Sequence, residues 1–159
     1  MTQNMFDDDN WYFAYGSNLS KEQMLRRTGS IPASKVALLE NYQFAFRKVL
    51  VGDEVFATIV PRQNSIVHGV VYRCSPQAML QLDHFEGLAE NCYRRELVHV
   101  TTQDGEILPC VVYVGHAFTD DSATPGASYW NLIRTGAHQH NLPVEYIQTL
   151  TQFARKSAK

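Results

Sequence analysis

The sequence is short of cysteine, of net charge and of long apolar runs, and each shortage excludes a class of protein. Its three cysteines are an odd number, which indicates reduced thiols in a cytoplasm and not a disulfide framework. A net charge of −2 is too small to hold nucleic acid or an acidic membrane surface. No apolar run approaches the roughly 20 residues of a membrane span, and the polar, acidic N-terminus does not read as a secretory signal. We therefore expect a cytoplasmic protein.

Signals for a metal site or a protein nucleophile are missing as well. The only close pair of histidines, His138 and His140, has no ligand spacing around it, and we expect both to be exposed near the end of a helix. No G-x-S-x-G elbow surrounds Ser17, and no Cys/His arrangement follows from spacing. The cysteines lie in or beside apolar stretches, so we expect small buried residues and neither metal nor cofactor: Cys74, Cys92 and Cys110.

What the chain does contain is enough apolar material for one domain. The 159 residues are 45% hydrophobic and 19% charged, and eight Tyr with eight Phe suit strands and barrels. We predict a polar N-terminal tail over residues 1–10, a single domain over 11–155 and a basic C-terminal tail over 156–159.

The order of elements predicts an α+β fold. Strand patterns lack regular alternation with helices, which argues against a doubly wound sheet and favours a small mixed β-barrel of about six strands with flanking helices. Asp104-Gly105 is a hairpin signal, and residues 119–127 read as a loop. The strands are expected at 11–15, 36–39, 42–47, 55–60 (ending at Pro61), 66–72, 93–100 and 107–114, and the helices at about 20–27, 76–86, 128–140 and 144–155.

The most informative segment is Y-F-A-Y-G-S-N-L, from Tyr12 to Leu19. An aromatic strand is broken by glycine, which can take a positive φ, and by two residues that hydrogen-bond their own backbone. Ser20 with a glutamine three residues later resembles a capping box at the start of a helix. Such a turn points backbone N–H groups outward and suits a carboxylate or a phosphate.

A second informative segment places Glu86 at the end of a helix, directly before Gly87. The negative end of the helix dipole disfavours a carboxylate there, and enclosure by aromatic neighbours would raise its pKa further. A carboxylate tuned upward suits proton transfer near neutral pH. We expect Asp83 and Glu90, by contrast, to be solvated surface residues.

These segments resemble the γ-glutamylcyclotransferase family. Y-G-S-N is similar to the family's substrate loop, and Asn18 favours this branch over the glutathione-specific cyclotransferases, which have leucine there. Glu86-Gly87, with Tyr93 seven residues later, resembles the family's catalytic segment. The resemblance continues through Tyr113 in C-V-V-Y, Tyr129 in A-S-Y-W, and T-G-A-H-Q-H-N-L-P-V-E-Y, and it therefore covers about residues 12–146. His84 and Phe85 depart from the polar residues expected before the glutamate.

The resemblance implies a compact mixed β-barrel and a cofactor-independent reaction. The α-amino group of a γ-glutamyl amino acid or amine attacks its own γ-carbonyl, which releases 5-oxoproline and the free amine. Glu86 would act as base and then as acid, and Tyr93 would support it. The implied partner is a small γ-glutamyl molecule, and a homodimer is compatible with the resemblance. The substrate-binding residues implied are Tyr12, Tyr15, Gly16, Ser17, Asn18, Tyr113 and Tyr129.

Other functions stay open from the sequence. The domain could bind an acidic small molecule or protein segment without catalysis, since the turn would serve that role equally well. It could also act on a γ-glutamylated biosynthetic intermediate. Glu86 separates catalysis from binding, because a pure binder of acidic ligands gains nothing from a carboxylate in its pocket.

Overall fold

The computed structural model describes residues 9–155, so the predicted tails lie outside the described residues except for Asp9 and Asn10. Asn10 already belongs to the first strand. In chain order the elements are β1 (Asn10–Ala14), the 3₁₀ turn η1 (Ser17–Leu19), α1 (Lys21–Thr28), β2 (Ser34–Val49), β3 (Val55–Cys74), α2 (Pro76–Phe85), the 3₁₀ turn η2 (Leu88–Glu90), β4 (Tyr93–Thr102), β5 (Ile107–Gly115), β6 (Phe118–Ser122), α3 (Ala127–Gln139) and α4 (Val144–Arg155).

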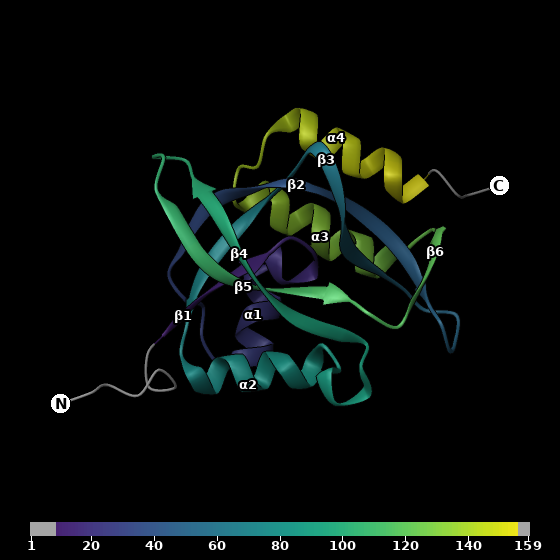
Figure 1. Ribbon diagram of the computed structural model, residues 1–159, viewed down its shortest axis with the longest axis horizontal. Coiled ribbons are helices and arrows are strands. Elements are labelled where there is room, and N and C mark those ends of the chain that lie inside the picture. The colour runs from purple at the N-terminus through teal and green to yellow at the C-terminus, as the bar shows by residue number, and fades with distance from the viewer. Residues whose placement is uncertain (1–8, 156–159) are drawn as a thin grey trace.

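Five of the strands close into a barrel (Figure 1). Their order is β3-β1-β5-β4-β2, and β2 pairs with β3 to complete the ring, while β6 extends the sheet beside β2. β1 runs parallel to β5, and the other pairs are antiparallel. The predicted fold, a small mixed β-barrel of about six strands with flanking helices, is confirmed, with five strands in the closed ring and β6 beside it.

The two longest strands differ from the prediction, which divided each of them in two. β2 continues through a β-bulge between Glu40 and Tyr42, where Asn41 takes a φ of 66°. β3 continues through Pro61, which pairs with Tyr42 directly after that bulge. Proline is tolerated where a bulge disturbs the hydrogen-bond ladder, so the prediction that the strand ends there is wrong.

The predicted loop over 119–127 is wrong in its first part. Residues 118–122 form β6, in which Phe118 pairs with Val49 and Ser122 with Arg47. The acidic sequence of this strand has no apolar alternation and is largely exposed, so only its pairing with β2 shows that it is a strand.

Local signals place the helices close to their predicted positions. Ser20 accepts a hydrogen bond from the Gln23 amide at 3.2 Å, and α1 ends at Gly29, whose φ is 85°. Pro76 opens α2, as its missing N–H allows. Gly105 turns the β4–β5 hairpin with a φ of 86°. Within residues 9–155, no helix is long and apolar enough to cross a membrane.

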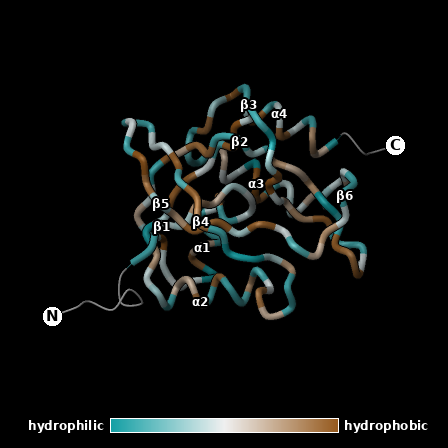
Figure 2. The backbone as a smooth tube through the Cα atoms, viewed as in Figure 1, coloured by the Kyte–Doolittle hydropathy of each residue, from teal (hydrophilic) through white to brown (hydrophobic). Residues whose placement is uncertain are grey.

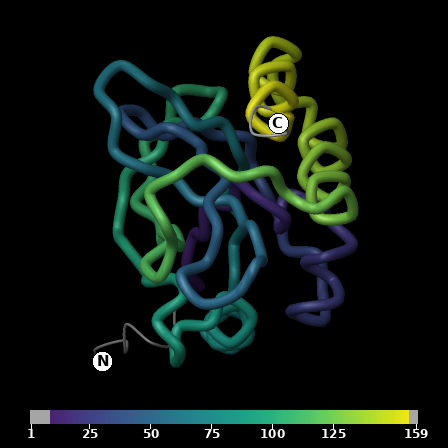
Figure 3. The backbone as a smooth tube through the Cα atoms, turned by 90° about the vertical axis from the view of Figure 1, so that its right-hand side faces the viewer, coloured from purple at the N-terminus to yellow at the C-terminus, as the bar shows by residue number. Residues whose placement is uncertain are grey.

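The core fills the barrel and the space beneath the helices. Phe13 and Tyr72, on the paired strands β1 and β3, are fully buried. Figure 2 shows apolar residues along the central strands and polar residues at the tip of the β4–β5 hairpin. Figure 3 shows α3 and α4 packed together along one side of the barrel, with α2 at its lower end.

Candidate active site

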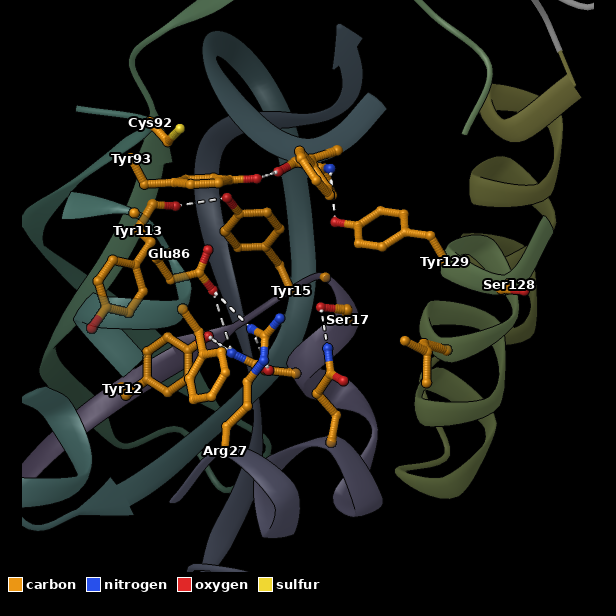
Figure 4. Close-up of a pocket in the computed structure, with 18 residues that line it drawn as sticks. Tyr12, Tyr15, Ser17, Arg27, Glu86, Cys92, Tyr93, Tyr113, Ser128 and Tyr129 are labelled. Atoms are coloured by element: carbon orange, nitrogen blue, oxygen red, sulfur yellow. Dashed lines mark hydrogen bonds and ion pairs between the residues drawn. The ribbon is translucent and has the colours of Figure 1, made fainter. Parts of the chain in front are cut away.

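One cavity of about 410 Å³ collects all the site residues predicted from the sequence (Figure 4). Its walls come from β1, η1, α1, α2, β3, β4, β5 and α3, so residues far apart in the chain meet there. The predicted residues that line it are Tyr12, Tyr15, Gly16, Ser17, Asn18, Glu86, Tyr93, Tyr113 and Tyr129.

The turn after β1 is a 3₁₀ turn, and only after it does α1 begin. The Leu19 amide donates to the Gly16 carbonyl at 3.0 Å. Gly16 has a φ of −115°, so this turn does not use the positive φ that glycine allows. Glycine instead allows close packing, since a Cβ there would lie 3.3 Å from the Cβ of Ala57, which is a tight contact. Only half of the predicted capping box forms. The Gln23 side chain donates from Nε2 to Ser17 Oγ at 2.9 Å, instead of bonding back to the backbone N–H of Ser20.

Buried side chains from β3 and from the end of α3 contact the backbone carbonyl groups of the η1 turn. The Tyr72 hydroxyl donates to the Asn18 carbonyl at 2.8 Å, and His140 Nε2 lies 3.0 Å from the Leu19 carbonyl oxygen. His140 is therefore buried, and its predicted exposure is wrong, whereas His138 is exposed as predicted. Helix α3 reaches the turn at Gly136, where a Cβ would lie 2.4 Å from a backbone carbon of Leu19.

Glu86 follows the last residue of α2 and turns its carboxylate into the cavity (Figure 4). Its amide donates to the Leu82 carbonyl at 2.8 Å, and Gly87 reverses the chain with a φ of 66°. The side chain is 15% exposed. Burial raises the pKa of Glu86 from its ordinary value of 4.5 to about 7, against the lowering effect of Arg27 and with a further rise from Asp83.

Asn18 connects the carboxylate to its neighbours. Its Nδ2 donates to the Tyr12 hydroxyl at 3.0 Å and lies 3.4 Å from Glu86 Oε1. Its Oδ1 accepts from Arg27 Nη1 at 3.2 Å. Burial, with the nearby Glu86 carboxylate, holds the pKa of Tyr12 well above its ordinary value, so this phenol stays neutral. The side chain of Asn18 thus ties the turn to the carboxylate.

Three of the tyrosines are anchored to backbone groups through their hydroxyls. Tyr15 donates to the Tyr113 carbonyl at 2.6 Å, and Tyr93 donates to the Ala57 carbonyl at 2.5 Å. The Tyr129 hydroxyl accepts from the Ala57 amide at 2.9 Å. These residues therefore present rings to the cavity in fixed positions.

Tyr113 directs its hydroxyl away from Glu86 (Figure 4). That hydroxyl donates to Asp83 Oδ1 at 2.6 Å, and Arg95 donates to both oxygens of the same carboxylate at 2.8 and 2.7 Å. Asp83 is 18% exposed and paired, so its predicted place on the solvated surface is wrong. Glu90 is exposed as predicted.

The cavity also contains residues that the sequence did not single out. Arg27 is the most important, and its position in the last turn of α1 resembled an ordinary cation at a helix end. Cys92 is partly buried and lines the cavity, whereas Cys74 and Cys110 are buried as predicted. Burial raises the pKa of both buried thiols to about 12. Among the described residues, no group of three His, Cys, Asp or Glu could hold a metal ion.

Comparison with known proteins places these features in a family. The profile described as gamma-glutamyl cyclotransferase, AIG2-like, matches residues 12–132. The chain is 32% identical over 144 residues to a human protein named gamma-glutamylcyclotransferase, covering 87% of this chain and 76% of that one. The mouse protein of the same name is 31% identical over the same shares. A solved structure named gamma-glutamyl cyclotransferase superposes with a TM-score of 0.83 at 31% identity, over 91% of this chain and 87% of that one. The chain therefore belongs to the gamma-glutamyl cyclotransferase, AIG2-like family.

Proposed function

We propose that this chain is a γ-glutamylcyclotransferase in which Glu86 transfers the protons. The substrate's α-amino nitrogen forms a bond to its γ-carbonyl carbon, and the bond from that carbon to the departing amine breaks. The products are 5-oxoproline and the free amino acid or amine. The observation that carries this proposal is a largely buried carboxylate beside the Gly16–Asn18 turn, in a cavity that suits a small molecule.

The pKa of Glu86 suits both halves of the proton transfer. The α-ammonium group must lose a proton before it can attack, and the departing amine must gain one. A carboxylate with a pKa of about 7 is partly charged at neutral pH, so it can accept the first proton and return it. Glu86 therefore acts as base and then as acid without a net change of protonation.

The turn after β1 supplies the complementary groups. The first N–H groups of a helical turn have no partner within that turn, so we propose that those of Ser17 and Asn18 bind the substrate. They are proposed to stabilise the oxyanion on the γ-carbon or to bind the α-carboxylate. Gly16 lets this backbone approach the substrate.

The tyrosines of the cavity are proposed to hold the substrate in its reactive conformation. Tyr12, Tyr15 and Tyr113 present rings that fold the glutamyl chain so that its amine faces its carbonyl. Tyr129 lines the opposite side of the cavity with its ring and hydroxyl. Tyr93 supports this wall through its bond to Ala57.

A serine nucleophile is disfavoured by the geometry. Ser17 Oγ accepts from Gln23 Nε2, and no histidine is among the residues that line the cavity in the described part of the chain. A cytoplasmic location and a homodimer are proposed from the sequence and the resemblance alone.

The experiment is a screen of γ-glutamyl amino acids and γ-glutamyl amines for release of 5-oxoproline by the purified protein. Glu86→Gln keeps the shape of the side chain, and we expect turnover to fall by about two to four orders of magnitude with little change in KM. Glu90→Gln is the matched control, since Glu90 is exposed on the neighbouring turn. Normal turnover by a folded Glu86→Gln protein would reject the assignment.

The same screen separates the other functions. A protein that binds γ-glutamyl compounds without releasing 5-oxoproline would be a binding domain. Ser17→Ala should retain activity, because the amide and not the hydroxyl is proposed to bind. An inactive Ser17→Ala protein, with a covalent acyl-enzyme detected in the wild type, would indicate a serine nucleophile.

A further inference from the structure

Arg27 is held at the cavity by two neighbours. Its guanidinium carbon lies 5.0 Å from the centre of the Phe85 ring, and its Nη1 donates to Asn18 Oδ1 at 3.2 Å. The side chain is 21% exposed and lines the cavity. A guanidinium has five N–H donors, and the bond to Asn18 is the one hydrogen bond that it makes within the described residues. Most of its donors are therefore available to a ligand.

Arg27 and Glu86 form a pair of opposite charges in an otherwise uncharged site. Arg27 Nη1 lies 3.6 Å from Glu86 Oε1, close enough for attraction but too far for a hydrogen bond. None of the other described residues that line the cavity is Asp, Glu, Lys, Arg or His. A ligand that carries both charges on adjacent groups would match this pair (Figure 4).

The glutamyl end of the proposed substrate is such a ligand. Its α-carbon carries an ammonium group and a carboxylate, so the two charges lie one carbon apart. The proposed reaction places the ammonium group against Glu86. The carboxylate then lies beside the cation next to Glu86, and a guanidinium can bind a carboxylate through two parallel hydrogen bonds.

We infer that Arg27 binds the α-carboxylate of the γ-glutamyl substrate while Glu86 faces the α-ammonium group; this inference rests on the proposed function. Under this assignment, Arg27 and the turn amides bind different groups of the substrate. With the α-carboxylate on Arg27, the amides of the Gly16–Asn18 turn are left for the oxyanion on the γ-carbon. Arg27 is thus a substrate-binding residue that selects γ-glutamyl groups with a free α-carboxylate.

Two small molecules test this assignment without depending on the departing amine. The product 5-oxoproline and 2-pyrrolidinone share one ring and differ by the carboxylate. Their dissociation constants can be measured by NMR titration of isotope-labelled wild type, Arg27→Gln and Arg27→Lys. Arg134→Gln removes an equal charge from the exposed face of α3 and serves as the control.

We expect Arg27→Gln to weaken 5-oxoproline binding by about 10- to 100-fold and to leave 2-pyrrolidinone within about twofold of wild type. Arg27→Lys should restore part of the loss, since it keeps the charge without the planar fork. An equal loss for both ligands would mean that Arg27 only maintains the shape of the site. No loss for either would place the carboxylate elsewhere, and both results overturn the inference. Failure of the proposed function would look different, because the wild type itself would then release no 5-oxoproline.

Discussion

Removing the titratable carboxylate of Glu86 should stabilise the protein at alkaline pH relative to acidic pH. Burial raises the pKa of Glu86 from 4.5 to about 7 in the folded state. The folded state therefore binds more protons than the unfolded state between these values, and stability falls as pH rises through them. Each pH unit corresponds to about 1.4 kcal/mol, so the whole penalty amounts to about 3 kcal/mol. It is absent below pH 4.5 and complete above pH 7.

The assay is urea unfolding of wild type and Glu86→Gln at pH 5 and pH 8. The free energy of unfolding of the variant, minus that of wild type, should be larger at pH 8 by about 2 to 3 kcal/mol. Any effect of the substitution that does not depend on pH, such as a change in side-chain packing, cancels in this comparison, whereas the pairing with Arg27 depends on the charge of Glu86 and is already included in its pKa. Equal differences at the two pH values would show that Glu86 has the same pKa in the folded and unfolded states, which would refute the argument from burial.

Three further predictions follow from the same geometry. The kcat/KM of the wild type should rise with pH through an apparent pKa near 7, because Glu86 must be charged to accept a proton; a flat profile between pH 5 and pH 9 would exclude Glu86 as the base. Gly136→Ala should cost about 1–3 kcal/mol in urea unfolding and reduce turnover, since its Cβ would press on the backbone of the turn, whereas Gly126→Ala, with open space around it, should have no effect. Turnover should survive a strong chelator and replacement of all three cysteines by alanine, and loss on chelation with recovery on added zinc would disprove this.

Local chemistry was enough to predict the parts of the site that depend on neighbours in sequence. The turn before α1 and the Glu86-Gly87 helix end were both located from the sequence. Pro76 and Gly105 marked a helix start and a hairpin for the same reason. At such positions local conformational preference determines the structure, because a glycine or a proline changes which φ values and which backbone hydrogen bonds are available.

Tertiary structure alone decided the features that depend on partners far along the chain. Pro61 continues a strand because a bulge on β2 lies opposite, and Asp83 is enclosed because Tyr113 and Arg95 pack against it. Arg27 becomes a cavity residue only because α2 brings Glu86 to within 3.6 Å of it. The pKa of that carboxylate has the same origin, since desolvation is set by everything that surrounds a group and not by the residues beside it in sequence.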